Sequence, residues 1–488
     1  MMPPTRHMTW LAALIGLRLL FSAWLWNEWA YLLPDGQLAL TAGDTESYLA
    51  PAETWIETGT WGYRPTVDGA VQPTAGRMPG YGLVYLFWRL FFGPSGARTA
   101  LVLLQWVLSV WVAWLLGGWV AQALRRPHVH GPAALFIGTA CWFVQYDLRL
   151  LTESLSLSVL GLAVVVAWRP PSRGNVLLLG ALLAAGVFLR PLLGWFWVGA
   201  GLCLAVGLRH LPWRAWAGRL LLFALPLLVF DGAWLARNRL AFDRWIPLQG
   251  SIWADYTYSP VRMALFDFVP AWGGDIVWWE PSAPIRVFLP DSVGGIASHP
   301  HNTLHALPKP LIRALGKPFL QALADSTRAA ESSSSDSLRV ARAVHLVLQA
   351  TAAYRAREPW DYQVGARLRL LRRYLVRSGT EDLLGRPAGS LPLHELLLKV
   401  YFSGLYVLLM GVGWVGLVAW AVRRRDDRMA ALVAVLAGYL LLIPWGFRFC
   451  EWRYQAPLLP FLLAGVVAAA VWLHVSWRSR KRPSSTAP

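Results

Sequence analysis

Residues 43–82 form the loop that follows the first long apolar run of the chain. The loop opens with Gly43–Tyr48, which reads GDTESY, and closes with Arg77–Gly82, which reads RMPGYG. A helix needs about 20 apolar residues to cross a membrane, so this loop is expected just outside the membrane, at the far end of a first helix. Its two carboxylates and its arginine suit chemistry at a lipid headgroup, where an anion takes a proton or holds a metal and a cation holds phosphate.

Composition places the chain in a membrane. Of its 488 residues, 56% are hydrophobic and only 15% are charged, with a mean hydropathy of +0.42. A soluble protein of this length would carry many more charges. The 30 tryptophans and 15 tyrosines suit aromatic belts at the two interfaces. Much of the net charge of +18 lies in short clusters between apolar segments, where it sets membrane orientation and does not indicate a nucleic-acid partner.

The apolar runs predict an all-α integral membrane protein with about ten transmembrane helices. The expected spans are residues 9–32, 97–122, 132–148, 152–168, 174–190, 191–208, 218–236, 396–421, 429–446 and 456–476. The first has no small-residue cleavage site soon after it, so it is read as a retained helix. The apolar run Tyr81–Phe92 is too short to span, which favours a helix lying in the interface.

Basic clusters determine the predicted orientation. They fall on one side of the expected spans, which the positive-inside rule assigns to the cytoplasm together with both termini. The predicted organisation is an N-terminal transmembrane module (1–236) with a catalytic outer loop (33–96), a large periplasmic segment (237–393), C-terminal helices (394–477) and a basic tail (478–488). Within the periplasmic segment, Ser337–Arg357 and Tyr362–Val376 have the three- and four-residue apolar spacing of helices.

The acidic residues of the outer face allow two interpretations. Asp44 and Glu46 suit a general base, with a divalent ion sharing the second carboxylate, but Asp-Thr-Glu before an apolar run is also good helix-capping chemistry. Glu153 opens an apolar helix from the same side and is expected to converge with Asp44. The alternative is capping by Glu153, together with a surface pair between Asp147 and Arg149.

Arginines on the outer side are not required for orientation. Arg77, Arg190, Arg237 with its neighbour Asn238, and Arg453 each lie at a predicted helix end or loop. Arginine is the preferred planar donor to phosphate oxygens, although snorkelling to lipid headgroups is the alternative. By contrast, Arg18 within the first helix is expected to snorkel toward the cytoplasm.

Two further stretches are candidate sites. Arg448–Tyr454 alternates charged and aromatic residues at a helix mouth, which favours a site. His299–His305 has spacing that could hold zinc, but no cysteine or carboxylate stands beside it, so a solvated loop is favoured. The three cysteines lie far apart and indicate neither a disulfide framework nor a zinc site. No nucleotide-binding loop is visible.

Several of these motifs resemble the polytopic glycosyltransferases of the GT-C class. The most similar members are the bacterial relatives of the dolichyl-phosphate-mannose–protein mannosyltransferases and the lipid A aminoarabinose transferases. The matching motifs are Asp44–Leu49, Arg77–Tyr81, Thr152–Leu155, Leu189–Pro191, Trp234–Asn238 and Glu451–Tyr454, within residues 40–260 and 445–470. Two departures stand out: Thr45 separates two acidic residues that are often adjacent in the family, and Ala233 replaces the usual proline before Trp234.

The resemblance implies an inverting transfer of a sugar from a polyprenyl-phosphate donor. Asp44 would be the base, and Glu46 or Glu153 a second acid or sugar ligand. The residues implied to bind the donor phosphate are Arg77, Arg190, Arg237, Asn238 and Arg453. Those implied to contact the sugar or headgroup are Tyr48, Tyr81, Glu451 and Tyr454.

The same resemblance implies a bacterial inner-membrane protein whose active site faces the periplasm. The leaving lipid phosphate is already a stable anion, so arginines can take the place of a metal, although a divalent ion remains compatible. The acceptor is left open among protein, lipid and glycan. Two rival functions remain: a transporter or flippase of a lipid-linked sugar, which would use the arginines without a base, and a non-catalytic membrane scaffold.

Overall fold

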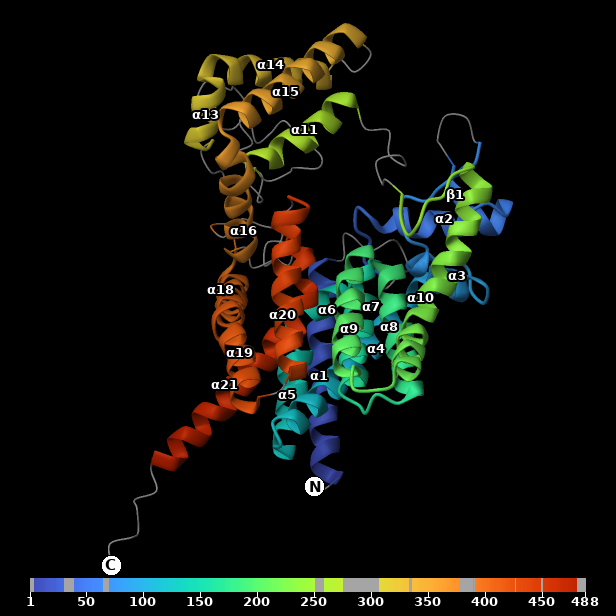
Figure 1. The fold of residues 1–488 in the computed structure, drawn as a ribbon, viewed down its shortest axis with the longest axis vertical. Helices are drawn as coiled ribbons and strands as arrows, with labels where there is room; N and C mark the ends of the chain where they lie inside the picture. The colour runs from blue at the N-terminus through green and yellow to red at the C-terminus, as the bar shows by residue number, and fades with distance from the viewer. Residues whose placement is uncertain are drawn as a thin grey trace, which may run out of the picture. The chain divides into compact units, whose positions relative to one another are not determined.

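The structure is a computed structural model (Figure 1). It describes residues 4–29, 39–64, 70–250, 259–274, 307–332, 336–376, 389, 391–425, 427–448 and 451–480. Its contacts divide the chain into a first unit, residues 1–255, 408–436 and 456–488, and a second unit, residues 256–407 and 437–455. Helix α10 continues past residue 237 to Phe242. The histidine-rich stretch 299–305 lies outside the described residues.

The first unit is built of helices and one short hairpin. Its helices are α1 (Pro4–Glu28), α2 (Thr45–Thr58), α3 (Gly80–Arg89), α4 (Pro94–Ala123), α5 (His130–Gly138), α6 (Cys141–Leu148), α7 (Thr152–Ala167), α8 (Arg173–Leu189), α9 (Gly194–Gly207), α10 (Trp213–Phe242), α19 (Trp414–Arg424), the first part of α20 (Asp427–Leu441) and α21 (Leu459–Arg480). Strands β1 (Gly62–Tyr63) and β2 (Gln72–Pro73) pair antiparallel, with Gly62 opposite Pro73.

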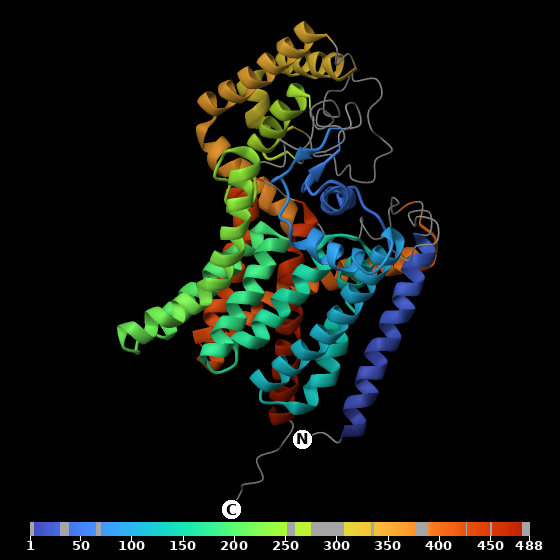
Figure 2. The same cartoon turned by 90° about the vertical axis from the view of Figure 1, so that its right-hand side faces the viewer.

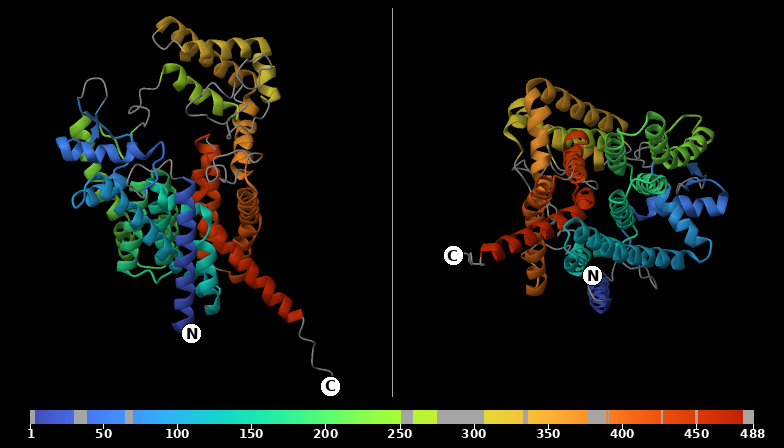
Figure 3. Two further views of the ribbon diagram at one scale, coloured as in Figure 1. Left: turned by 180° about the vertical axis from the view of Figure 1, so that it is seen from behind. Right: turned by 60° about the horizontal axis from the view of Figure 1, so that its bottom comes forward.

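Helix pairs make the core of the first unit. Helix α4 packs against α5 and α7. Helix α8 packs against α7 and α10, and Figure 2 shows α8 and α10 in green. Helix α21 crosses α19 (Figure 3). At this crossing a Cβ on Gly416 would lie 2.0 Å from the carbonyl oxygen of Gly465, so only glycine permits the approach.

The chain is an all-α multi-pass membrane protein. Among the described residues, six helical stretches are long and apolar enough to cross a membrane, and three shorter apolar helices accompany them. The six are Arg6–Glu28, Pro94–Ala123, Trp213–Phe242, Leu393–Arg424, Asp427–Gly446 and Trp452–Trp477. Within the described residues the predicted spans fall on helix except at the break inside 132–148, and most of Tyr81–Phe92 lies on α3.

One predicted span is not continuous. Residues 132–148 form two short helices, α5 and α6, because the backbone becomes extended at Ala140. The break leaves the carbonyl of Gly138 without its helical partner, and the guanidinium of Arg18 donates to this oxygen at 2.7 Å. The prediction of one continuous helix was therefore wrong, and a buried arginine takes up the freed carbonyl.

The snorkelling prediction for Arg18 was also wrong. This side chain is fully buried, forms an ion pair with Asp147 and donates to Ser109 Oγ at 2.7 Å. A surface pair between Asp147 and Arg149 is likewise absent, since Asp147 is buried against Arg18. Arg149 instead lies over the ring of Trp29, with its guanidinium carbon 4.2 Å from the ring centroid.

The second unit is helical in its described parts. It contains α11 (Pro260–Ala271), α13 (Lys309–Leu315), α14 (Lys317–Ser332), α15 (Ser337–Arg357), the π-turn η5 (Asp361–Gly365), α16 (Ala366–Val376), most of α18 (Leu393–Leu408) and the π-turn η8 (Leu442–Gly446). Phe268, Trp272, Leu320, Val347 and Tyr354 are buried in its core. The helices predicted at Ser337–Arg357 and Tyr362–Val376 are confirmed.

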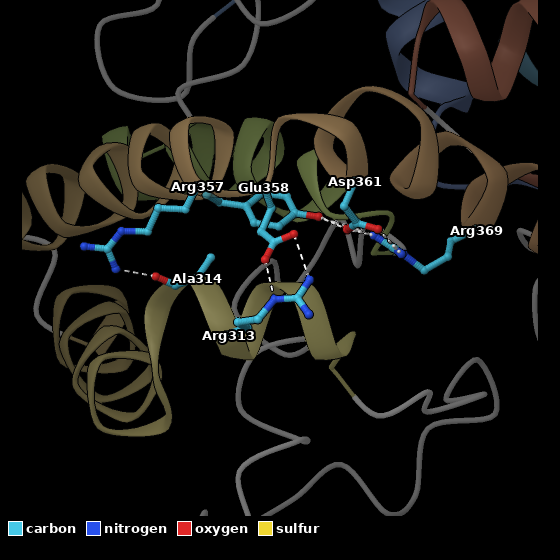
Figure 4. Close-up of polar contacts among 7 residues, drawn as sticks. Arg313, Ala314, Arg357, Glu358, Asp361 and Arg369 are labelled. Carbon is cyan, nitrogen blue, oxygen red and sulfur yellow. Dashed lines mark hydrogen bonds and ion pairs between the residues drawn. The ribbon is translucent and has the colours of Figure 1, made fainter.

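Ion pairs join the helices of the second unit (Figure 4). Arg313 on α13 holds Glu358 just after α15, with Nε 2.5 Å from Oε1 and Nη2 2.9 Å from Oε2. Arg369 on α16 donates to Asp361 at 2.6 Å, and the hydroxyl of Tyr354 also donates to this carboxylate. The π-turn is therefore anchored to both neighbouring helices.

Candidate functional site

The loop that leads into α2 is hydrogen-bonded to the turn before α7. The backbone amide of Leu40 donates to Leu148 O at 2.9 Å, and that of Leu150 donates to Leu40 O at 3.0 Å. The hydroxyl of Thr45 donates to Leu150 O at 3.1 Å. These bonds place the N-terminus of α2 beside the N-terminus of α7, so segments about a hundred residues apart build one site.

Asp44 forms an ion pair with Arg77. Asp44 occupies the N-cap position of α2, yet its side chain makes no capping hydrogen bond. Its Oδ1 instead lies 2.9 Å from Arg77 Nη2, and both side chains are partly exposed, at 24% and 17%. Arg77 Nη1 donates to the hydroxyl of Tyr48 at 3.3 Å. The capping alternative is therefore not realised, and both ends of the loop meet at this pair.

Glu153 and Arg190 form a second, more deeply buried pair. Arg190 Nη1 lies 2.9 Å from Glu153 Oε1, and the side chains are 11% and 1% exposed. Glu153 opens α7, whereas Arg190 follows the last residue of α8. A Cβ on Gly80 would lie 2.5 Å from the carbonyl oxygen of Phe188. The start of α3, just after Arg77, therefore touches the end of α8.

Two tyrosines lie between these pairs. The rings of Tyr48 and Tyr81 meet edge to face, with centroids 5.7 Å apart. Burial raises the pKa of the Tyr81 hydroxyl, and the nearby charge of Glu153 raises it further. This hydroxyl donates to Gln105 Oε1 at 2.8 Å. Tyr81 thus stays protonated, in contact with Tyr48 and within the field of Glu153.

Sequence reasoning missed Gln105. The amide of this fully buried side chain donates to the carbonyls of Asp147 and Arg149 at 2.9 and 3.0 Å, while its oxygen accepts from Tyr81. The available signal was an amide in the middle of the apolar run of α4, where a buried polar group needs partners. Gln105 connects α3 to the turn that precedes Glu153.

Glu46 lies outside this group of contacts. Its side chain is 65% exposed and pairs with Arg98 on α4, with Oε1 3.1 Å from Nη2. Asp44 and Glu46 therefore have different arginine partners and do not share one as a paired acidic site would. Among the residues that the structure describes, no group of three or more histidine, cysteine or acidic side chains could hold a metal ion.

Arg237 and Asn238 hold backbone segments together. Arg237 donates to the carbonyls of Trp61 and Thr74 at 2.5 and 2.7 Å, next to the β1–β2 hairpin. Asn238 Nδ2 donates to Ile246 O at 2.9 Å, in the chain that leaves α10. In this structure the two side chains position loops, because their donors face carbonyl oxygens.

Glu451, Arg453 and Tyr454 belong to the second unit. Arg453 Nε lies 2.5 Å from Glu451 Oε1, and its guanidinium carbon lies 5.6 Å from the centroid of the Tyr454 ring. The three residues form one local group. The group presents an anion, a cation and an aromatic ring within four residues of the chain, and its ion pair is partly exposed.

The first-unit contacts define the candidate site: the pairs Asp44–Arg77 and Glu153–Arg190, with Tyr48 and Tyr81 between them. Carboxylates can take or hold a proton, and guanidinium groups can bind oxyanions in a fixed plane. Both pairs are less than a quarter exposed, which strengthens their electrostatics relative to bulk water. The arrangement suits proton transfer beside a bound anion.

Comparisons with known proteins add one finding. No protein-family model matches the chain, and no curated protein matches it. Among solved structures, the chain is similar to the crystal structure of ArnT from Cupriavidus metallidurans in the apo state. The sequences are 16% identical, the match covers 98% of this chain and 81% of that chain, and the TM-score is 0.34. A score this low does not establish a shared fold.

Proposed function

We propose that the protein is an inverting GT-C glycosyltransferase that moves a sugar from a polyprenyl-phosphate donor to an acceptor at the outer face of a bacterial inner membrane. The observation that carries the proposal is the Asp44–Arg77 pair, placed beside the buried Glu153–Arg190 pair at the ends of apolar helices. Buried or half-buried ionisable groups at such positions are costly and mark functional sites.

The reaction assigns a separate role to each member of the pair. An acceptor hydroxyl or amine attacks the anomeric carbon, its proton passes to Asp44, and the bond from that carbon to the donor phosphate breaks. The lipid phosphate leaves with the electron pair of that bond. Arg77 and Arg190 stabilise this anion, so no further charge has to be supplied as the bond breaks. Binding of the phosphate by Arg77 also loosens its hold on Asp44, which exposes the base.

The remaining assignments follow from contacts or from resemblance. Glu153 holds Arg190 and acts as second acid or sugar ligand, while Tyr48 and Tyr81 contact the sugar. Glu46 is a weaker candidate because its carboxylate is exposed and faces Arg98. Arg237 and Asn238 act mainly by positioning the loop. Arg453, with Glu451 and Tyr454, is assigned to the donor headgroup on the motif resemblance alone.

The test compares donor binding and turnover in nanodiscs. Asp44→Asn should lower consumption of a polyprenyl-phosphate sugar about 10²- to 10⁴-fold, the usual contribution of a general base. Binding should be retained, because Asn no longer competes with phosphate for Arg77. Glu57→Gln is the matched control: Glu57 lies on the same helix and forms an exposed pair with Arg64. This control should leave turnover unchanged.

Three outcomes would overturn the proposal. Full turnover by Asp44→Asn would exclude Asp44 as the general base. Binding by wild type and variant alike, with no donor consumed but with movement of the lipid-linked sugar across a vesicle bilayer, would establish the transporter or flippase alternative. Failure of the wild type to bind the donor would reject both lipid-linked functions.

A further inference from the structure

Three arginines of the second unit gather beside the π-turn η5. The guanidinium carbon of Arg448 lies 4.1 Å from the centroid of the Tyr362 ring, and that of Arg355 lies 5.7 Å from it. Arg367, on α16 just after the π-turn, donates from Nε to Trp445 O at 3.0 Å. Helix α16 and the π-turn η8 pack against each other, which brings Arg367 and Arg448 together.

No carboxylate of the described residues balances the positive charges of this group. Among the residues that the structure describes, Arg355, Arg367 and Arg448 form no ion pair, and the hydrogen bonds of Arg367 go to Gln363 and Trp445. The nearby carboxylates Glu358 and Asp361 are paired with Arg313 and Arg369. Both of these carboxylates are therefore already engaged by arginines outside this group.

Two features accompany this crowding. Burial lowers the pKa of Arg367, and the like charge of Arg448 lowers it further. Arg448 also has a φ of 52°, in the left-handed region that non-glycine residues rarely adopt. Such backbone conformations persist where the surroundings hold them, and they cluster at ligand sites. A bound anion would compensate the repulsion.

We propose that Arg355, Arg367 and Arg448, presented around Tyr362, form a phosphate-binding site in the second unit. Guanidinium groups bind phosphate oxygens in a planar, bidentate manner, and the tyrosine ring orients the cations without neutralising them. An open depression beside the group has a volume of about 490 Å³ and is lined by Leu348, Thr351, Arg355 and Tyr362. It offers room for the group that carries the phosphate. Its three arginines are not among the residues assigned to the donor.

The phosphate could come from a bilayer lipid headgroup or from a molecule in solution, so the test uses matched probes. Delipidated full-length protein in neutral detergent is titrated with inorganic phosphate, dioctanoyl phosphatidic acid and dioctanoylglycerol, which has the same chains without phosphate. Binding is read by equilibrium dialysis for phosphate and by native mass spectrometry for the lipids. We expect phosphatidic acid to bind at least tenfold more tightly than dioctanoylglycerol.

The variants distinguish binding at the three arginines from nonspecific attraction to the positive charge of the unit. Arg355→Gln, Arg367→Gln and Arg448→Gln together should weaken binding of phosphatidic acid at least tenfold. The control replaces Arg342, Arg372 and Lys317, which are exposed on the same unit, by glutamine and should bind like wild type. The single change Arg448→Lys keeps the charge but removes the planar guanidinium group, and it should weaken binding of phosphatidic acid. It provides the test if the triple variant fails to fold.

The outcomes are distinct. Binding of phosphatidic acid alone identifies a lipid headgroup as the source, whereas binding of inorganic phosphate as well identifies the anion itself. Equal loss in the site and control triple variants would overturn the proposal, as would equal binding of phosphatidic acid and dioctanoylglycerol. The Asp44→Asn protein should bind like wild type, so the result does not depend on the glycosyltransferase proposal.

Discussion

Arg18, in the middle of α1, and Asp147, near the end of α6, form an ion pair from which water is excluded. The side chains are 0% and 1% exposed, and Ser154 Oγ donates to the same carboxylate at 2.5 Å. The carbonyl of Asp147 accepts from Gln105, which also holds Tyr81. The first helix is therefore linked through buried hydrogen bonds to the candidate site.

Removing one charge of the pair should destabilise the protein more than replacing both residues by apolar ones. Asp147→Asn leaves the Arg18 charge buried without its counter-ion and should destabilise the protein by about 3–5 kcal/mol. The double variant Arg18→Met with Asp147→Leu should recover much of that loss. Unfolding in detergent, followed by intrinsic fluorescence against added denaturing detergent, measures both. Equal destabilisation by the single and double variants would contradict the buried-pair account.

Arg77→Lys tests the planar geometry at the donor site. Lysine keeps the charge but cannot contact Asp44 and Tyr48 with a fixed fork. Losing one charge-assisted hydrogen bond, worth about 1.5–3 kcal/mol, should raise the donor Kd about 10- to 100-fold. The control is Arg64→Lys, in an exposed pair with Glu57. An unchanged Kd for Arg77→Lys would exclude direct phosphate binding by Arg77.

Gly80→Ala tests the contact between α3 and α8. The added methyl would lie 2.5 Å from Phe188 O and 3.0 Å from Leu189 N, so the start of α3 has to shift. Overpacking of this kind costs about 1–3 kcal/mol, and the shift should move Arg77 away from Arg190 and lower donor turnover. Gly232→Ala is the control, because its Cβ would meet nothing within 4 Å. Wild-type turnover by Gly80→Ala would show that the contact does not position the site.

Arg237→Met distinguishes positioning from phosphate binding. Removal of the guanidinium leaves the carbonyls of Trp61 and Thr74 without their donor, so amide hydrogen exchange around the β1–β2 hairpin should accelerate. Turnover should fall, with the donor Kd changing less than in Arg77→Lys. Unchanged exchange with a large rise in Kd would instead favour direct contact between Arg237 and the phosphate.

The second unit should lose stability in acid through Asp361. Burial opposes its charge, but hydrogen bonds from Arg369 and Tyr354 outweigh burial and lower the pKa of this carboxyl. The stabilisation is therefore complete above the unfolded pKa, about 3.9, and is lost as the pH falls through the lower folded value. Hydrogen exchange in α15 and α16 should accelerate below about pH 4. Asp361→Asn should remove this step, and an unchanged step would contradict the assignment.

Helix positions could be predicted from the sequence because they depend on local pattern. Apolar runs of membrane length and three- to four-residue spacing are properties of neighbouring residues, so the predicted spans and the helix Ser337–Arg357 coincide with helices. The break between α5 and α6 was missed because apolar composition continues through it.

The sequence indicated residues of the candidate site but not how they pair. Asp44, Arg77, Glu153 and Arg190 were chosen as charged residues beside apolar helices, but their pairing could not be read from spacing. Asp44 and Glu46 are neighbours in sequence and still take different partners, Arg77 and Arg98. Helical geometry sends side chains two residues apart toward different sides.

By itself, the sequence determined that this is a helical membrane protein with charged groups at helix ends, because hydropathy and periodicity are local quantities. Tertiary structure alone decided which charges meet. Arg18 and Asp147 are 129 residues apart in the chain, and Arg237 reaches Trp61 across 176. Such contacts depend on the packing of whole helices, and the cost of an unpaired buried charge then selects the partner.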